Sequence, residues 1–362
     1  MGPLRSSGGT FETIWWDLQG PHFTDREEKW LVQVLTANKQ QSPNLNSGPL
    51  TSDPGIIPIV GVPYLAFTQY WILSVLTLGW LVYDWKTHSQ GGRRSNWVRN
   101  WTLWKYFRDY FPIKLVKTCE LSPSHNYIFA THPHGILSYG IFCNFGTEST
   151  GFSHIFPGIT PTLATLEGIF WIPIVREYVM SKGICPVSKA ALKYLLTKMG
   201  SGNAVIVVVG GASEAFMCLP GSTSIILKNR KGFVKLAFQT GAQLVPCYSF
   251  GENEVHKQKV FADGTWLRFF QYWYQTIAKS ILGLSLCTFY GRGLTRDSWG
   301  FLPFNLPITT VVGEPIPVPK IEKPSREMVD KYHSLYIKAL QKLFDEHKVQ
   351  YGISETQELI IM

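Results

Sequence analysis

The pattern of apolar and polar positions divides the chain into segments of different character. Residues 1–54 are polar, rich in Gly, Pro, Ser and Asn, and show no sustained period, which predicts a mostly disordered region. The segment 55–85 is apolar, and no residue between 56 and 83 is charged. Residues 86–125 are basic and rich in Trp. From residue 126 to residue 362, short apolar runs alternate with helical patterns.

The region 126–362 has the pattern of an α/β domain. Apolar, β-branched runs typical of buried strands recur at residues 127–130, 204–209, 244–248 and 308–312. Helical patterns lie between them: one runs from an N-cap at Ser188 to a stop at Gly200, and another ends at Gly241. This alternation predicts a mostly parallel sheet flanked by helices.

A final amphipathic helix is predicted over residues 325–352. The residues expected on its buried face are Met328, Tyr332, Leu335, Ala339 and Leu343. His333 and His347 fall off this stripe and are expected at the surface.

The apolar segment 55–85 is long enough for one membrane helix of about 20 residues, but not for two. Pro58, Gly61 and Pro63 interrupt its first third, so the best helix runs over residues 66–84. A buried core helix is the alternative. Many more basic residues follow the segment than precede it, which places the downstream domain in the cytosol. A single span and a re-entrant hairpin both stay open.

The basic, Trp-rich segment predicts a helix that lies on the membrane surface. Trp97, Trp101 and Trp104 recur at helical spacing, and Arg99 lies on another face. Such a stripe is often core, but beside an apolar segment and basic residues it favours an interfacial helix. A stretch of similar composition begins at Thr265 and predicts a second membrane-associated element.

Composition agrees with a membrane protein whose domain lies in the cytosol. Charged residues make up 16% of the chain and aromatic residues 14%, with 13 Trp, which is unusual for an ordinary cytosolic enzyme. The net charge of +9 suits nucleic acid, anionic lipid or a phosphorylated ligand equally well. The six cysteines are scattered without a CxxC pair, so reduced thiols are expected and no zinc site is indicated.

The stretch His132-Pro133-His134-Gly135 directly follows the predicted strand at 127–130. Reactive groups of α/β sheets lie beyond the carboxyl ends of strands, and a histidine there suits general-base work on a hydroxyl. The motif alone leaves three interpretations open: a catalytic base, a structural turn, and a metal site. No third metal ligand is evident in the sequence.

A second candidate follows the strand predicted at 204–209. Gly210 and Gly211 end the apolar run, and Glu214 comes soon after. An acid at this place can orient a histidine, as carboxylates do in catalytic triads. The alternative is that Glu214 only begins the next helix, where acids suit the helix dipole.

A basic cluster lies at the start of a predicted helix: Lys228, Arg230, Lys231 and Lys235. Basic side chains at a helix start are a natural site for phosphate groups. Nucleic acid is the rival ligand, but the cluster is short and no nucleic-acid-binding module appears, so no nucleic-acid partner is expected.

Together these stretches resemble the type-2 diacylglycerol acyltransferase family, over residues from about 71 to the C-terminus. The resemblance is carried by blocks in the family's order: Gly91-Gly92-Arg93-Arg94-Ser95, Tyr110-Phe111-Pro112, His132-Pro133-His134-Gly135, Gly210-Gly211-Ala212-Ser213-Glu214, Arg230-Lys231-Gly232-Phe233, Phe250-Gly251-Glu252-Asn253-Glu254 and Gly291-Arg292-Gly293. The resemblance is greatest for diacylglycerol acyltransferase 2-like and wax-synthesising members, and it implies an α/β fold like that of glycerolphosphate acyltransferases.

The resemblance implies an endoplasmic reticulum membrane enzyme, found also at lipid droplets, that moves a fatty acyl group from acyl-CoA to a lipid alcohol. The acceptor would be diacylglycerol, monoacylglycerol or a long-chain alcohol, with acyl-CoA as co-substrate and no other cofactor. It also implies that His134 is the catalytic histidine, His132 its neighbour and Glu214 the supporting acid. Arg230 and Lys231 are assigned to the CoA phosphates on charge alone. The oligomeric state stays open.

Two features depart from the family's pattern. Family members carry a hairpin of two adjacent apolar segments, whereas here the apolar segment before Thr68 is short and interrupted. Tyr290 stands where relatives usually have a histidine. A catalytically weak member that binds lipid at a membrane or droplet is therefore the alternative function.

Overall fold

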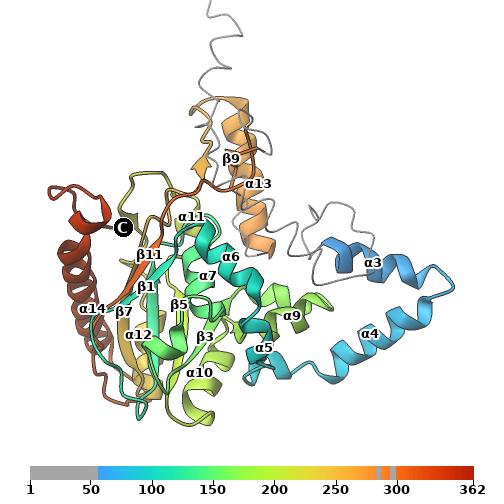
Figure 1. Ribbon diagram of the computed structural model, residues 1–362, viewed down its shortest axis with the longest axis horizontal. Coiled ribbons are helices and arrows are strands. Elements are labelled where there is room, and N and C mark those ends of the chain that lie inside the picture. Colours follow the sequence, from blue (N-terminus) through green and yellow to red (C-terminus); the bar gives the residue numbers. More distant parts are fainter. Residues whose placement is uncertain (1–55, 283–286, 294–298) are drawn as a thin grey trace, which may run out of the picture.

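The computed structural model describes residues 56–282, 287–293 and 299–362 (Figure 1). The predicted disordered region 1–54 lies outside the described residues. A seven-stranded sheet, with the strand order β1-β11-β7-β2-β5-β3-β4, forms the centre of the molecule. Its strands are β1 (Lys114–Lys117), β2 (Tyr127–His132), β3 (Thr160–Thr165), β4 (Ile184–Pro186), β5 (Asn203–Val208), β7 (Gln243–Phe250) and β11 (Thr309–Val312).

The prediction of a mostly parallel α/β sheet is confirmed. Strands β7, β2, β5, β3 and β4 are parallel neighbours, whereas β11 runs antiparallel to β7 and carries β1 parallel to itself. Strands β3 and β4 were not predicted from the sequence. Strand β1 falls within the segment 86–125, so the domain begins before residue 126.

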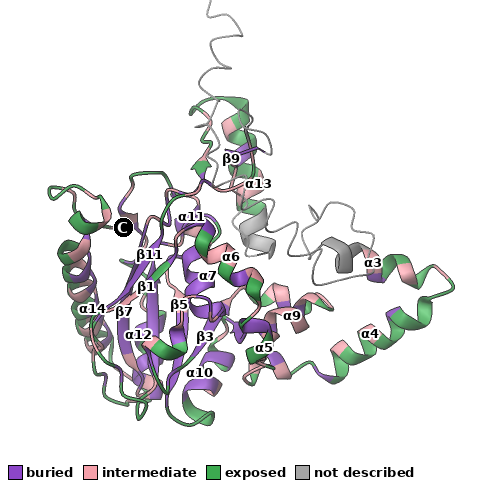
Figure 2. Cartoon of the chain, viewed as in Figure 1, coloured by how far each residue is buried: buried purple, intermediate pink, exposed green. Residues whose placement is uncertain are grey.

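Alternating residues of each central strand pack into two different layers. On one face Ile128 and Ala130 belong to a core cluster that includes residues of α10 (Lys189–Lys198), α12 (Gly232–Thr240) and α14 (Arg326–His347). On the other face Tyr127 and Phe129 pack with residues from α7 (Tyr139–Gly146), α8 (Phe152–Ile155) and α9 (Val175–Ser181). Figure 2 shows the strands buried between these layers, as expected for parallel strands covered on both faces.

Helix ends were predicted better than the buried face of the last helix. The Ser188 side chain accepts a hydrogen bond from the backbone N–H of Ala191, and Gly241 ends α12 in the left-handed region. In α14, however, the buried residues are Val329, His333, Tyr336, Leu340, Leu343 and Phe344. The predicted face was therefore correct in part: Met328 and Tyr332 pack against the core and Leu343 is buried. By contrast, Leu335 is 42% exposed, and His333, expected at the surface, is buried.

The Trp-rich segment forms two short helices instead of one, α5 (Asn96–Arg99) and α6 (Thr102–Tyr110). Trp97 is exposed, but Trp104 is buried and donates a hydrogen bond to the carbonyl of Val98. Arg99 is also buried, where it pairs with Glu148 at 2.8 Å. Part of the segment predicted to be interfacial is therefore core, because its arginine finds a carboxylate inside the domain.

The apolar segment 55–85 does not form the single helix predicted over residues 66–84. It folds into α3 (Ile56–Ala66) and α4 (Trp71–Tyr83), joined by a short turn. The Ser74 hydroxyl donates a hydrogen bond to the carbonyl of Val62 at 2.7 Å, which ties the two helices together. Within the part of the chain that the structure describes, no helix combines the length and the apolarity needed to cross a bilayer.

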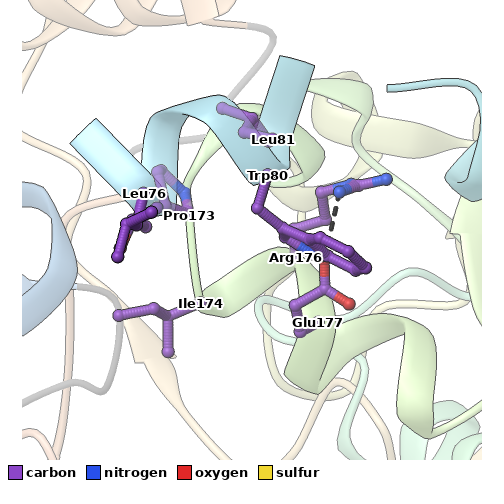
Figure 3. Close-up of a pocket in the computed structure, with 8 residues that line it drawn as sticks. Leu76, Trp80, Leu81, Pro173, Ile174, Arg176 and Glu177 are labelled. Carbon is purple, nitrogen blue, oxygen red and sulfur yellow. Dashed lines mark hydrogen bonds and ion pairs between the residues drawn. The ribbon is translucent and has the colours of Figure 1, made fainter. Parts of the chain in front are cut away.

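Buried charges attach α4 to the α/β domain. Asp84, at the end of α4, accepts hydrogen bonds from Arg176 of α9 at 2.7 Å and from Arg93. Arg93 also pairs with Glu177 at 3.0 Å. Figure 3 shows Trp80 of α4 beside Arg176 and Glu177, at one end of an apolar pocket of about 420 Å³ that Leu76, Leu81, Pro173 and Ile174 also line.

An arm projects from the domain at the top of Figure 1. It consists of α13 (Trp266–Leu282) and a small sheet of β8 (Lys257–Gln258), β9 (Phe289–Arg292) and β10 (Trp299–Gly300). The remaining elements are η1 (Thr87–Ser89), η2 (Glu167–Trp171), α11 (Gly211–Ala215), β6 (Ser224–Ile225), η3 (Val349–Tyr351) and β12 (Ile360–Ile361), of which β6 and β12 pair with each other.

Candidate active site

The three motifs that follow β2, β5 and β7 meet at one edge of the sheet. Because these strands are parallel neighbours, their carboxyl ends are adjacent; Thr131 is paired with Val208, and His132 with Tyr248. The histidine turn follows β2, the helix α11 with Glu214 follows β5, and the Glu252 segment follows β7. The predicted meeting of His134 and Glu214 is therefore observed.

Glu214 contacts the main chain of His134, which differs from the predicted contact with the imidazole. Its Oε1 accepts the backbone N–H of His134 at 2.6 Å, and its Oε2 accepts that of Ile226 at 2.7 Å. The carboxyl folds back over Gly210, where a Cβ would lie 2.1 Å from Oε2. Only glycine leaves room for this arrangement. Burial raises the pKa of Glu214 to about 7.

The ring of His134 is oriented by its own turn. Nδ1 lies 3.0 Å from the carbonyl oxygen of Gly135, which can only accept, so Nδ1 carries the proton. Nε2 is then the unprotonated nitrogen of the neutral ring. The side chain is half-buried, and burial lowers its pKa below the usual value of 6.5. A neutral imidazole with a basic Nε2 can accept a proton from a hydroxyl.

His132 has a different environment from His134. Its side chain is fully buried at the end of β2, 6.2 Å from the ring of Tyr336 between centroids. Neither ring nitrogen has a hydrogen-bond partner among the residues that the structure describes, and burial lowers its pKa to about 3. Burial therefore favours the neutral form of His132, and its ring packs at the end of β2, directly before the turn. In residues 56–282, 287–293 and 299–362, no three His, Cys, Asp or Glu side chains are arranged to hold a metal ion.

Glu252 is a second buried acid of the site, and its role was missed in the sequence. A Cβ on Gly135 would lie 2.8 Å from Cγ of Glu252, so the acid packs directly against the histidine turn. Its Oε2 accepts the backbone N–H of Gly140, in the first turn of α7, at 3.0 Å. Burial raises its pKa to about 8. The rule that pointed to Glu214, an acid just after an apolar strand, would also have found Glu252.

Tyr290 lies on the arm, next to the buried His256. Tyr290 is in β9 and pairs with Lys257 of β8. His256, buried beside this strand, contacts the ring of Phe289 with 4.7 Å between centroids. Its Nε2 is 3.0 Å from the hydroxyl of Tyr139, in α7. His256, which directly precedes β8, therefore places a histidine close to Tyr290.

Comparison with known proteins decides the family. The model of the diacylglycerol acyltransferase family matches residues 63–362. The chain belongs to this family. It is 71% identical over 309 residues to the Bos taurus diacylglycerol O-acyltransferase 2-like protein 6, covering 85% of this chain and 92% of that protein.

Two human relatives are also close to this acyltransferase. It is 56% identical over 297 residues to diacylglycerol O-acyltransferase 2, covering 82% of this chain and 76% of the relative. It is 54% identical over 303 residues to acyl-CoA wax alcohol acyltransferase 2, covering 84% and 90%. A solved structure, the 1-acyl-sn-glycerophosphate acyltransferase PlsC from Thermotoga maritima, aligns over 80% of this chain and 99% of its own at 14% identity, with a TM-score of 0.34.

In this acyltransferase Arg230 and Lys231, the two residues expected to bind the CoA phosphates, lie in different environments. Nη2 of Arg230 lies 3.4 Å from the carbonyl of Gly210 and 3.3 Å from the hydroxyl of Ser213, so its guanidinium borders α11 and the site. Lys231 pairs with Asp330 of α14 at 2.6 Å. That pair lies in a polar pocket of about 600 Å³, which Asn229, Lys235, Pro324, Arg326 and Val329 also line.

Proposed function

We propose that this acyltransferase transfers a fatty acyl group from acyl-CoA to the hydroxyl of a lipid alcohol. The observation that carries the proposal is the contact between Nδ1 of His134 and the Gly135 carbonyl, from which we infer that Nδ1 holds the proton and Nε2 is free to act as a base. His134 lies at the edge of the sheet where α/β enzymes place reactive groups. Two of its relatives are named for diacylglycerol and for wax alcohol, which supports a lipid alcohol as acceptor.

His134 Nε2 would remove the proton as the acceptor oxygen attacks the thioester carbonyl. The new C–O bond forms, the C–S bond breaks, and the proton passes from His134 to the leaving CoA sulfur. Glu214 and Glu252 would act as positioning residues, because both contact the main chain around the turn. His132 would support the turn from below. Backbone N–H groups near Gly210 and Gly211 are candidates to stabilise the oxyanion.

Arg230 and Lys231 are proposed to bind the phosphates of CoA. Arg230 is the stronger candidate, because it borders α11 beside Glu214. Lys231 would have to exchange its pairing with Asp330 for a phosphate. The reaction written above needs no cofactor other than acyl-CoA as co-substrate.

The enzyme is further proposed to lie in the endoplasmic reticulum membrane and at lipid droplets, with its α/β domain in the cytosol. Helices α3 and α4 would enter the bilayer as a re-entrant hairpin. Large apolar residues of this pair are open to solvent: Phe67 is 91% exposed, Val82 74% and Tyr83 85%. Burying such side chains in lipid is favourable by roughly 25 cal/mol per Å².

The test is acyl transfer by microsomes that contain the protein, given labelled acyl-CoA and a panel of diacylglycerol, monoacylglycerol, long-chain alcohol and retinol. We expect an ester product with at least one acceptor, unaffected by EDTA and lost in His134→Ala. The matched control is His125→Ala, a histidine on the loop before β2. No product with any acceptor would favour a lipid-binding protein without catalysis, and an unchanged rate in His134→Ala would refute the general-base role.

A further inference from the structure

Helix α13 carries its apolar stripe on the outside. Trp266, Phe269, Phe270 and Trp273 stand at positions i, i+3, i+4 and i+7, the spacing of one helix face. They are 74%, 72%, 52% and 52% exposed, respectively. In a soluble protein such a stripe would face the core, so its exposure calls for another apolar phase or partner.

The inner side of the same helix is held by polar contacts. Gln271 is buried, and its Nε2 donates hydrogen bonds to the carbonyl of Lys259 at 2.8 Å and to the hydroxyl of Thr288 at 3.1 Å. The hydroxyl of Tyr274 also bonds that of Thr288. These contacts tie α13 to the segments around β8 and β9 and fix its orientation, with the apolar stripe outward.

The composition and charge of the residues around α13 favour phospholipid as the binding partner of the apolar stripe. The stripe is built from Trp and Phe, and the neighbouring Tyr272 is 67% exposed; Trp and Tyr are the side chains that favour the membrane–water boundary. Residues 257–282 contain four basic residues and one acid, Asp263. Lys257 and Lys259 are exposed on and beside β8, where they match anionic headgroups.

We infer that α13 is a second lipid-binding element, which lies in the plane of a phospholipid surface with its Trp/Phe stripe in the acyl-chain boundary. The inference rests on the proposed membrane function and adds to the α3–α4 hairpin a contact on a separate part of the molecule (Figure 1). Helix α13 has 17 residues, and among the residues that the structure describes no helix, α13 included, is long and apolar enough to span a bilayer. An in-plane helix needs no such length.

The position of α13 links lipid binding to the active site. The thiol of Cys287, between α13 and β9, donates to the carbonyl of Ala215 at 3.3 Å, in the helix that carries Glu214. His256, before β8, reaches Tyr139 behind the histidine turn. Docking of α13 would therefore hold the sheet edge with His134 close to the lipid surface, where an apolar acceptor is dissolved.

The test uses the full chain in vesicles of phosphatidylcholine and phosphatidylserine that contain a phospholipid with a photoactivatable acyl chain. After illumination, labelled peptides are mapped by mass spectrometry. We expect label in α13 and in α4, and only background in α14. The variant Trp266→Ser/Phe269→Ser/Trp273→Ser should lose the α13 label and keep that of α4. The control Val187→Ser/Leu335→Ser/Val349→Ser, at exposed apolar positions elsewhere, should label as the wild type does.

A second readout separates docking from chemistry. The stripe variant should lose acyl transfer to an acceptor presented in vesicles and keep the wild-type rate with acceptor in detergent micelles. Label in α4 but background in α13 of the wild type would overturn the inference and leave the membrane function standing. Background in both helices would refute the membrane function as well. Protein–protein crosslinks at α13 without lipid label would assign the stripe to another chain and also overturn the inference.

Discussion

His134 is supported through its backbone by Glu214 and through its ring by the Gly135 carbonyl. Replacing Glu214 by Gln keeps the size of the side chain, but presents an NH₂ group to one of two backbone N–H donors. We expect the turn to shift and kcat to fall by up to about 10²-fold, less than the about 10²- to 10⁴-fold loss for His134→Ala. The double variant should be little worse than His134→Ala alone, since the two act as one unit. Fully additive losses in initial-rate measurements would contradict this coupling.

The raised pKa of Glu252 predicts how the stability of the folded protein depends on pH. Its pKa is raised from 4.5 to about 8, so the folded protein holds the proton more tightly than the unfolded chain does. The stability from this group is complete below pH 4.5 and is lost as pH rises toward 8. Glu252→Gln should show a smaller fall in Tm between pH 5 and pH 8 than the wild type in detergent. Glu346→Gln, on an exposed side chain, should match the wild type; equal slopes in all three proteins would reject the assignment.

At the scale of elements, the ion pair of Arg176 and Asp84 decides how α4 is attached. Arg176 is fully buried, so Arg176→Ala would leave the Asp84 carboxylate without its buried partner. Breaking a buried pair costs about 3–5 kcal/mol, and because Arg93 still pairs with Asp84 the loss here should lie at or below the lower end of that range. We expect a clear drop in Tm and new protease cleavage between α4 and α5. Arg326→Ala removes only a 4.0 Å contact of a 93% exposed side chain, and should change stability by less than about 0.5 kcal/mol. A similar Tm for both variants would show that the pair does not anchor α4.

At the scale of the whole molecule, the charge distribution predicts the orientation in the membrane. If the protein lies in a membrane as proposed, the basic residues after α4 predict a cytosolic α/β domain. Some of these charges are paired, namely Arg93 with Asp84, Arg99 with Glu148 and Arg108 with Asp109. Lys105 is a further basic residue of α6. Protease added to sealed microsomes should remove a C-terminal tag. Full protection of the tag, with digestion only after detergent is added, would reverse the orientation.

Features that depend on neighbours along the chain could be predicted from the sequence. The strand patterns at 127–130, 204–209 and 244–248 were correct because strands buried on both faces need continuous apolar runs. The Ser188 cap and the Gly241 stop were correct because caps act within one helical turn. A parallel sheet placed the motifs of His134 and Glu214 at the same edge, and the structure adds that their strands, β2 and β5, are neighbours.

Features that depend on partners distant in sequence could be seen only in the folded protein. Arg99 is buried because Glu148 lies opposite it, and His333 is buried because its Nε2 meets the carbonyl of Leu227 at 3.1 Å. The carboxylate of Glu214 contacts the backbone of His134 instead of its ring, because Gly210 lets the side chain fold back. Local propensity does not contain these contacts, because each polar group is buried only where the fold brings a matching partner.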